Sequence, residues 1–109
     1  MAGYFLLKRS GEQFLFDLRA GNHQTILTSE RYTRKESAQG GIAVVKALAH
    51  DDKRYQRMVS AAGQPYFVIV AANGEVVGTS QMYSSTGAME DGIASCKVNG
   101  PAAATREET

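Results

Sequence analysis

The sequence predicts an α+β protein in which tandem β-β-β-α repeats form one mainly antiparallel six-stranded sheet with two helices packed on one face. Two observations lead to this fold class. First, the stretch TSERYTRKESAQGGIA, which begins at Thr28, returns fifty-one residues later as TSQMYSSTGAMEDGIA. Second, each copy alternates apolar and polar residues, as half-buried strands do, and then changes to the i, i+3, i+4 spacing of an amphipathic helix. Repeats of this length usually bury their apolar faces against each other.

An offset of fifty-one aligns the two copies without a gap from Tyr4 to Ala49, and twelve of the forty-six aligned pairs are identical. We therefore expect a single domain over residues 1–109, built of two repeats at about 3–51 and 54–101. Residues 102–109 are expected to form a disordered tail. The identical pairs are Tyr4/Tyr55, Gln13/Gln64, Phe16/Phe67, Ala20/Ala71, Asn22/Asn73, Thr28/Thr79, Ser29/Ser80, Tyr32/Tyr83, Gly41/Gly92, Ile42/Ile93, Ala43/Ala94 and Lys46/Lys97.

Three strands are expected in each copy. The middle strand is the clearest, because Phe14, Phe16, Leu18 and Ala20 alternate with Leu15, Asp17 and Arg19. In the second copy Asn73-Gly74 follows this strand and predicts a two-residue type I′ hairpin turn, since both residues tolerate the positive φ that this turn needs. The expected strands cover 4–9, 12–20 and 24–32 in the first copy and 55–60, 64–72 and 75–83 in the second.

A helix is expected after each third strand. Thr33 and Glu36 have the spacing of a capping box, and Ser84 holds the place of Thr33 in the second copy. Glycine inside a helix costs about 0.5–1 kcal/mol relative to alanine. Gly41 and Gly92 therefore predict a close approach of each helix to the sheet, with a tyrosine ring filling the space. The apolar stripes are Ala38, Gly41, Ile42, Val45, Leu48 and Ala49, and then Met89, Gly92, Ile93 and Cys96.

These patterns closely resemble the YegP-like family, catalogued as domain of unknown function 1508. The resemblance is carried in order by GYFLLKRSGEQFLFDLRAGN, ILTSERYTRKESAQGGIA, RYQRMVSAAGQPYFVIVAANGEVVGTSQMYSS and DGIASCK, and it covers about residues 3–101. It implies a single antiparallel sheet with strand exchange between the halves, and it implies no activity. The chain departs from the family pattern at KALAHDD and in the tail AAATREET.

Composition and motifs exclude several classes of function. The net charge of +1 and the pI near 7.9 are too balanced to indicate a nucleic-acid binder. A single cysteine, Cys96, rules out an intramolecular disulfide and fits a reducing compartment, and no apolar stretch approaches eighteen residues. We therefore expect a soluble cytoplasmic protein that does not associate with membranes.

Candidate catalytic residues are not found. Cys96 lies on an apolar stripe, where a thiol behaves as a small inert hydrophobe. His23 and His50 lack a third metal ligand at a recognised spacing. The chain has no nucleophile elbow, paired-acid or phosphate-loop motif. The sequence thus predicts no cofactor and no metal, and it favours a protein that is not an enzyme.

Positions that differ between the copies are the best candidates for function, because the fold that the copies share does not require a particular residue there. Arg31, Arg34 and Lys35 become Met82, Ser85 and Thr86 in the second copy. Cations in the first turn of a helix oppose its dipole, whereas an anion bound there is favoured. Arg31, Arg34 and Lys35 therefore form a candidate anion-binding cluster, which Lys53, Arg54 and Arg57 could extend. The competing interpretation is an ordinary solvated face.

The second difference lies on the strand face turned away from the helices. Tyr66, Val68, Val70 and Val76 stand there in the second copy, where the first has Leu15, Asp17, Arg19 and Thr25. An open apolar patch at these residues predicts a site for a protein partner or for self-association, unless loops or the tail cover it. We expect a non-catalytic binding or interaction module. The alternative is a phosphate or nucleic-acid binder that uses the basic cluster, and a small enzyme comes third.

Overall fold

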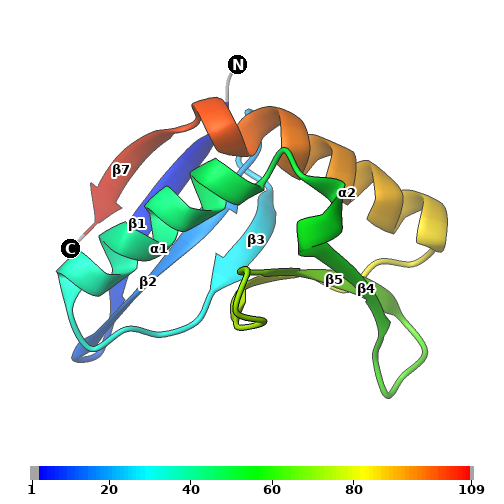
Figure 1. Cartoon of the computed structure of the whole chain (residues 1–109), viewed down its shortest axis with the longest axis horizontal. Helices are drawn as coiled ribbons and strands as arrows, with labels where there is room; N and C mark the ends of the chain where they lie inside the picture. Colours follow the sequence, from blue (N-terminus) through cyan, green and yellow to red (C-terminus); the bar gives the residue numbers. More distant parts are fainter. Residues whose placement is uncertain (1–2, 109) are drawn as a thin grey trace.

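The computed structural model describes residues 3–108 and contains one mixed sheet with two helices (Figure 1). The strands stand in the order β4-β5-β6-β3-β2-β1-β7, and every neighbouring pair is antiparallel except β1 and β7. The elements are β1 (Tyr4–Ser10), β2 (Gln13–Arg19), β3 (Thr25–Ser29), α1 (Lys35–Leu48), η1 (Asp52–Arg54), β4 (Tyr55–Val59), β5 (Pro65–Val70), β6 (Val76–Ser80), α2 (Thr86–Asn99), η2 (Gly100–Ala102) and β7 (Ala104–Glu108).

The α+β class and the predominance of antiparallel pairs are confirmed, but the prediction of six strands is wrong. Residues 104–108, which the sequence pattern assigns to a tail, form the seventh strand beside β1. Each side chain of β7 is exposed, so the segment has no apolar alternation that would reveal a strand. Its side chains reach two partners: Lys35 forms an ion pair with Glu107, and the Arg106 guanidinium lies 4.1 Å from the centre of the Tyr4 ring.

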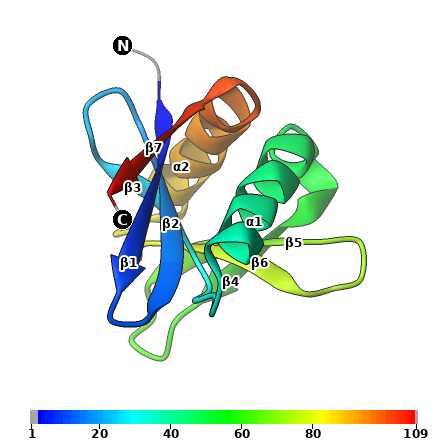
Figure 2. The same ribbon diagram turned by 90° about the vertical axis from the view of Figure 1, so that its left-hand side faces the viewer.

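The two copies meet at the centre of the sheet, where β3 pairs with β6. Figures 1 and 2 show α1 and α2 side by side on one side of the sheet. Each helix also reaches the third strand of the other copy, since α1 contacts β6 and α2 contacts β3. The three strands of each copy stay together, and only β7 crosses over, because it follows the second helix and pairs with β1 of the first copy.

The gapless alignment of the copies fails at the first strand of each repeat. Leu18 of β2 and Ile69 of β5 are equivalent, because they are fifty-one residues apart. Phe5 stands opposite Leu18, and Tyr55 stands opposite Ile69. The structural equivalent of Tyr55 is therefore Phe5 and not Tyr4. The cause is loop length: residues 11–12 join β1 to β2, whereas residues 60–64 join β4 to β5. A shift of one residue turns a strand's side chains to the opposite face. Tyr55 is therefore in the core, while Tyr4 faces away from the helices.

The hairpin turn at Asn73-Gly74 has a different form from the predicted type I′ turn. Gly74 has a φ of 85°, but Asn73 does not have a positive φ. The N–H of Gly74 bonds to the Ala71 carbonyl, and the N–H of Ala71 bonds to the Glu75 carbonyl. This is a three-residue loop in which a turn is followed by one left-handed residue. The first copy builds the same loop with His23, whose φ is 71°.

The core lies between the helices and the sheet and contains the expected apolar stripes. Phe5, Phe16 and Phe67 are fully buried there, together with Val45 and Ile93.

The helix starts differ from the prediction. The residue that caps α1 is Arg34, without a side-chain bond, so the expected capping box at Thr33 does not form. In the second copy Ser85, one residue after the expected Ser84, accepts a bond from the Ala88 N–H.

Candidate functional site

The expected apolar patch lies on the sheet face that the helices do not cover, but its exposure differs from the prediction. Val68 and Val70 are only 7% and 8% exposed, so the expectation that they form an open surface is wrong. Val68 stands between Gln56 of β4 and Thr79 of β6, and neighbours on both sides cover a short side chain on an inner strand. Tyr66 is half-buried and Val76 is 37% exposed.

Exposed apolar surface in the second copy is found instead along the outermost strand, β4. Met58, which stands opposite Tyr66, is 39% exposed, and Val59 is 69% exposed. Within residues 3–108, β4 pairs only with β5, so its outer edge has no neighbouring strand. We call this edge, with Met58, Val59 and Tyr66, the β4 edge.

The direction of the backbone groups along the β4 edge follows from one hydrogen bond in β5. The N–H of Phe67 bonds to the Ser80 hydroxyl, on the β6 side of β5. In an antiparallel ladder the backbone groups of successive residues point to alternate sides. Arg57, opposite Phe67, thus turns its N–H and carbonyl outward, and so does Val59. Unpaired groups of this kind are a template for another strand.

A cluster of charged side chains lines the helix side of the β4 edge. The Arg57 guanidinium bonds to both oxygens of Glu90 on α2, at 2.6 and 3.1 Å, and to Asp52 at 3.2 Å. Lys97 donates to the same Asp52 oxygen at 2.7 Å. Hydrogen bonds from Lys97 and then Arg57 lower the pKa of Asp52, and the bond from Arg57 lowers the pKa of Glu90. Both carboxylates therefore stay ionised near neutral pH.

The first copy has a polar cluster where the second has Val68 and Val70. The Asp17 carboxylate is almost fully buried and contacts Lys8 at 2.8 Å, Arg19 at 3.0 Å and the Thr28 hydroxyl at 3.1 Å. This carboxylate is held by two cations and one hydroxyl within the sheet. Its position indicates a structural role, because each of its partners is another residue of the same sheet.

Arg31, Arg34 and Lys35, the predicted anion-binding cluster, lie near the start of α1, but two of them have carboxylate partners. Arg34 lies 3.6 Å from Glu36, and Lys35 forms an ion pair with Glu107 of β7. Arg31 is exposed in the segment that precedes the helix. Of the residues that could extend the cluster, Arg54 pairs with Asp51. Neighbouring carboxylates thus compensate most of this positive charge, which weakens its attraction for an anion.

Cys96 lies on the buried face of α2 and is fully buried, as expected from the apolar stripe. Burial raises the pKa of its thiol to about 11, so at neutral pH the group is a protonated thiol and not a nucleophile. Tyr55, which packs nearby, donates its hydroxyl to the Ala49 carbonyl at 2.6 Å. Within the part of the chain that the structure describes, no helix is long and apolar enough to cross a membrane.

Sequence reasoning missed the β4 edge. The relevant signal was present in YQRMV, where Met58 and Val59 end a strand that has few charges. Whether that strand lies inside the sheet or at its edge depends on the strand order, which the local pattern does not contain.

Comparisons with known proteins agree with this architecture. A 109-residue alignment with a UPF0339 protein of Bordetella pertussis gives 56% identity and covers the whole chain and 98% of that protein. UPF0339 protein YegP of Escherichia coli strain K12 is 46% identical over 110 residues, with full coverage of both chains.

Two solution NMR structures have the same fold. The structure of YegP from E. coli, described as a protein of unknown function, matches with a TM-score of 0.94 and 45% identity over all of this chain and 95% of that one. A UPF0339 protein of Shewanella oneidensis matches with a TM-score of 0.92 and 44% identity over 98% and 92%. The family model of the domain of unknown function DUF1508 matches twice, at residues 10–56 and 60–107. The chain therefore belongs to the DUF1508 family, as a member with two tandem copies of the domain.

Proposed function

We propose that the protein is a non-catalytic interaction module that accepts an extended segment of a partner protein along the β4 edge. The observation that carries this proposal is the difference between the two outer strands of the repeats. β1 and β4 are equivalent, but β1 is covered by β7, whereas β4 has no such strand within residues 3–108.

The pairing of β7 with β1 supplies a template for the partner's segment. β7 runs parallel to β1 over five residues, and its side chains remain exposed, so its backbone bonds make a large part of the contact. Addition of a strand to a free edge gains affinity from the backbone and specificity from pockets for alternate side chains. On the β4 edge, side chains on one side of an added strand would meet Met58, and those on the other would meet Arg57 and Glu90.

The phosphate or nucleic-acid alternative is less well supported. It relies on Arg31, Arg34 and Lys35, two of which already have carboxylate partners. A partner surface that includes Val68 and Val70 is also less well supported, because these side chains are buried. Met58, Val59 and Tyr66 are the apolar contacts that remain available beside a backbone edge that has no neighbouring strand within residues 3–108.

The experiment captures proteins from a lysate of the source organism on the immobilised parent chain, identifies them by mass spectrometry and measures the affinity of each purified candidate. Arg57→Pro removes an outward N–H, and proline is tolerated in an edge strand at such a position. We expect this variant to weaken binding about tenfold or more, as the loss of central contacts at an interface does.

The matched control is Arg57→Gln, which also loses the ion pairs with Glu90 and Asp52 but keeps the backbone N–H. It should retain most of the affinity. In the complex with the parent chain, hydrogen exchange at the amides of Arg57 and Val59 should slow. Equal binding by the proline variant and the parent, or unchanged exchange along β4, would show that partners bind elsewhere.

A further inference from the structure

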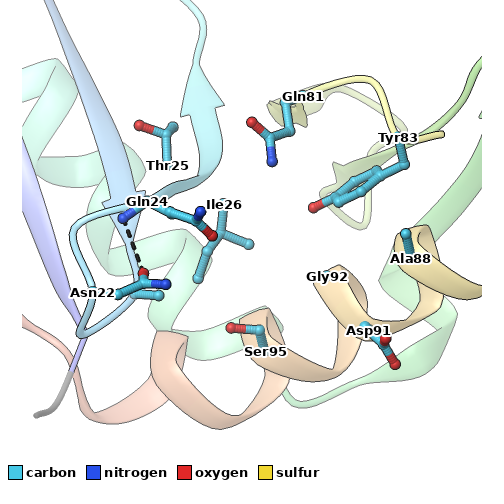
Figure 3. A pocket seen from close by; sticks show the side chains of 11 residues that line it. Asn22, Gln24, Thr25, Ile26, Gln81, Tyr83, Ala88, Asp91, Gly92 and Ser95 are labelled. Carbon is cyan, nitrogen blue, oxygen red and sulfur yellow. Dashed lines mark hydrogen bonds between the residues drawn. The ribbon is translucent and has the colours of Figure 1, made fainter.

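A second feature, independent of the β4 edge, is a pocket of about 260 Å³ between the β2-β3 hairpin and α2 (Figure 3). Its walls come from both copies. The hairpin contributes Asn22, Gln24 and Thr25, the segment after β6 contributes Gln81 and Tyr83, and α2 contributes Asp91 and Ser95. Its apolar lining comprises Ala20, Ile26, Ala88 and Gly92. The volume is slightly below the range for drug-sized ligands, so a smaller molecule fits.

The polar groups of this pocket converge. Figure 3 shows the side chains of Gln24, Gln81 and Tyr83 approaching the same space from different sides. Ser95 is oriented by Asn99, whose amide nitrogen donates to the Ser95 hydroxyl at 3.1 Å, so the hydroxyl hydrogen of Ser95 is left to donate elsewhere. Burial raises the pKa of Tyr83, so its hydroxyl remains a donor. Side-chain amides add both donors and acceptors.

The same location in the other half of the molecule has the same scaffold but lacks four of the neutral polar side chains. Asn22, Tyr83 and Gly92 are repeated as Asn73, Tyr32 and Gly41. Four neutral polar residues, Gln24, Thr25, Gln81 and Ser95, correspond to Glu75, Val76, Glu30 and Val44, whereas Ala88 and Asp91 correspond to Ser37 and Gly40. Val44 and Val76 are each 37% exposed at this second location. A shared fold does not require the polar set, because the other copy folds without it.

We propose that the pocket binds a small uncharged ring that carries neighbouring hydroxyl groups. Amides and hydroxyls that act as donor and acceptor match hydroxyl groups, which also do both, and the apolar lining matches the carbon face of such a ring. The lining residues include no lysine, arginine or histidine within residues 3–108, and Asp91 stands at the pocket. Anionic ligands are therefore disfavoured. Free monosaccharides and the ribose of a nucleoside share the required chemistry.

The test is an NMR titration of the isotope-labelled chain with ribose, glucose, uridine and uridine monophosphate. An open pocket and a ligand of this size predict dissociation constants of about 1 mM or weaker. Backbone amide shifts should be confined to the β2-β3 hairpin, residues 81–83 and α2. Binding of the sugars alone would identify the ring as sufficient, whereas binding of uridine alone would show that the base also contributes.

The copies themselves supply matched variants. Thr25→Val together with Ser95→Val introduces the residues of the other location and should weaken binding about tenfold, because two hydrogen-bonding groups are lost. The control pair, Val76→Thr with Val44→Ser, changes the other location and should leave binding unaltered. The proposal would be overturned by the absence of shifts with all four probes, by shifts centred outside the pocket, by tighter binding of uridine monophosphate than of uridine, or by full binding in the valine variant.

Discussion

The Tyr32 hydroxyl lies directly against Gly41: a β-carbon placed on this glycine would come within 2.5 Å of the hydroxyl oxygen and 2.9 Å of the Phe16 ring. Tyr83 covers Gly92 in the same way in the second copy. The close approach of helix and sheet that the buried glycines predict is thus confirmed. The Tyr32 ring stacks on that of Phe16, at an angle of 12°, and Phe16 is itself fully buried against this glycine, so the space beside Gly41 is filled from the core.

Replacement of Gly41 by leucine should therefore destabilise the protein. We expect the free energy of unfolding to fall by about 1–3 kcal/mol, because the new side chain overpacks the contact with Tyr32. Urea denaturation followed by circular dichroism measures the change. Gly40→Ala is the control: a β-carbon added there would meet no atom within 4 Å, so alanine should raise stability by about 0.5–1 kcal/mol. Equal stability of parent and leucine variant would contradict the close packing.

Burial explains why the repeat and its apolar periods predicted the central strands and both helices. Side chains such as Phe16 and Ile42 face the core. The spacing of such buried residues along the chain therefore follows the period of the strand or helix that carries them. The register of the first strands could not be predicted in this way. The stretch from Tyr55 to Ile69 is one residue longer than the equivalent stretch from Phe5 to Leu18, and no apolar pattern marks the extra residue. β7 escaped prediction because its side chains are exposed.

A second prediction concerns the buried carboxylate of the first copy. Asp17→Val alone should lower the free energy of unfolding by about 3–5 kcal/mol, because Lys8 and Arg19 are left without their counter-ion. The cost should approach the lower end, since both cations are partly exposed. Thermal and chemical denaturation provide the measurement.

The other copy supplies the compensated variant. At the structurally equivalent positions it has Met58, Val68 and Val70. Lys8→Met and Arg19→Val, added to Asp17→Val, should recover most of the lost stability, because replacing a complete buried ion cluster with apolar residues is often neutral. A triple variant no more stable than the single one would show that Asp17 acts through something other than these two cations.

The candidate sites were accessible to sequence reasoning only where the two copies differ. That comparison selected Val68 and Val70 correctly as positions of different chemistry, yet it placed them on an open surface. It missed the pocket, since Gln24 and Ser95 belong to different copies and are brought together only because α2 packs against β3. Edges and pockets depend on the order of strands and the crossing of helices, which local periodicity does not encode.

The last prediction uses the buried thiol of Cys96 as a probe of stability against pH. Burial raises its pKa in the folded protein to about 11, whereas a thiol in an unfolded chain has a pKa of about 8.5. The folded state thus favours the protonated form, and this contribution is fully present below about pH 8.5 and is lost as the pH rises through 11. Between these values the free energy of unfolding should fall by about 3 kcal/mol more in the parent than in Cys96→Ala, which differs from the parent only by the loss of the thiol. Urea denaturation of both proteins from pH 7 to pH 11 tests this, and parallel pH profiles would show that the thiol is not held in a low-dielectric site.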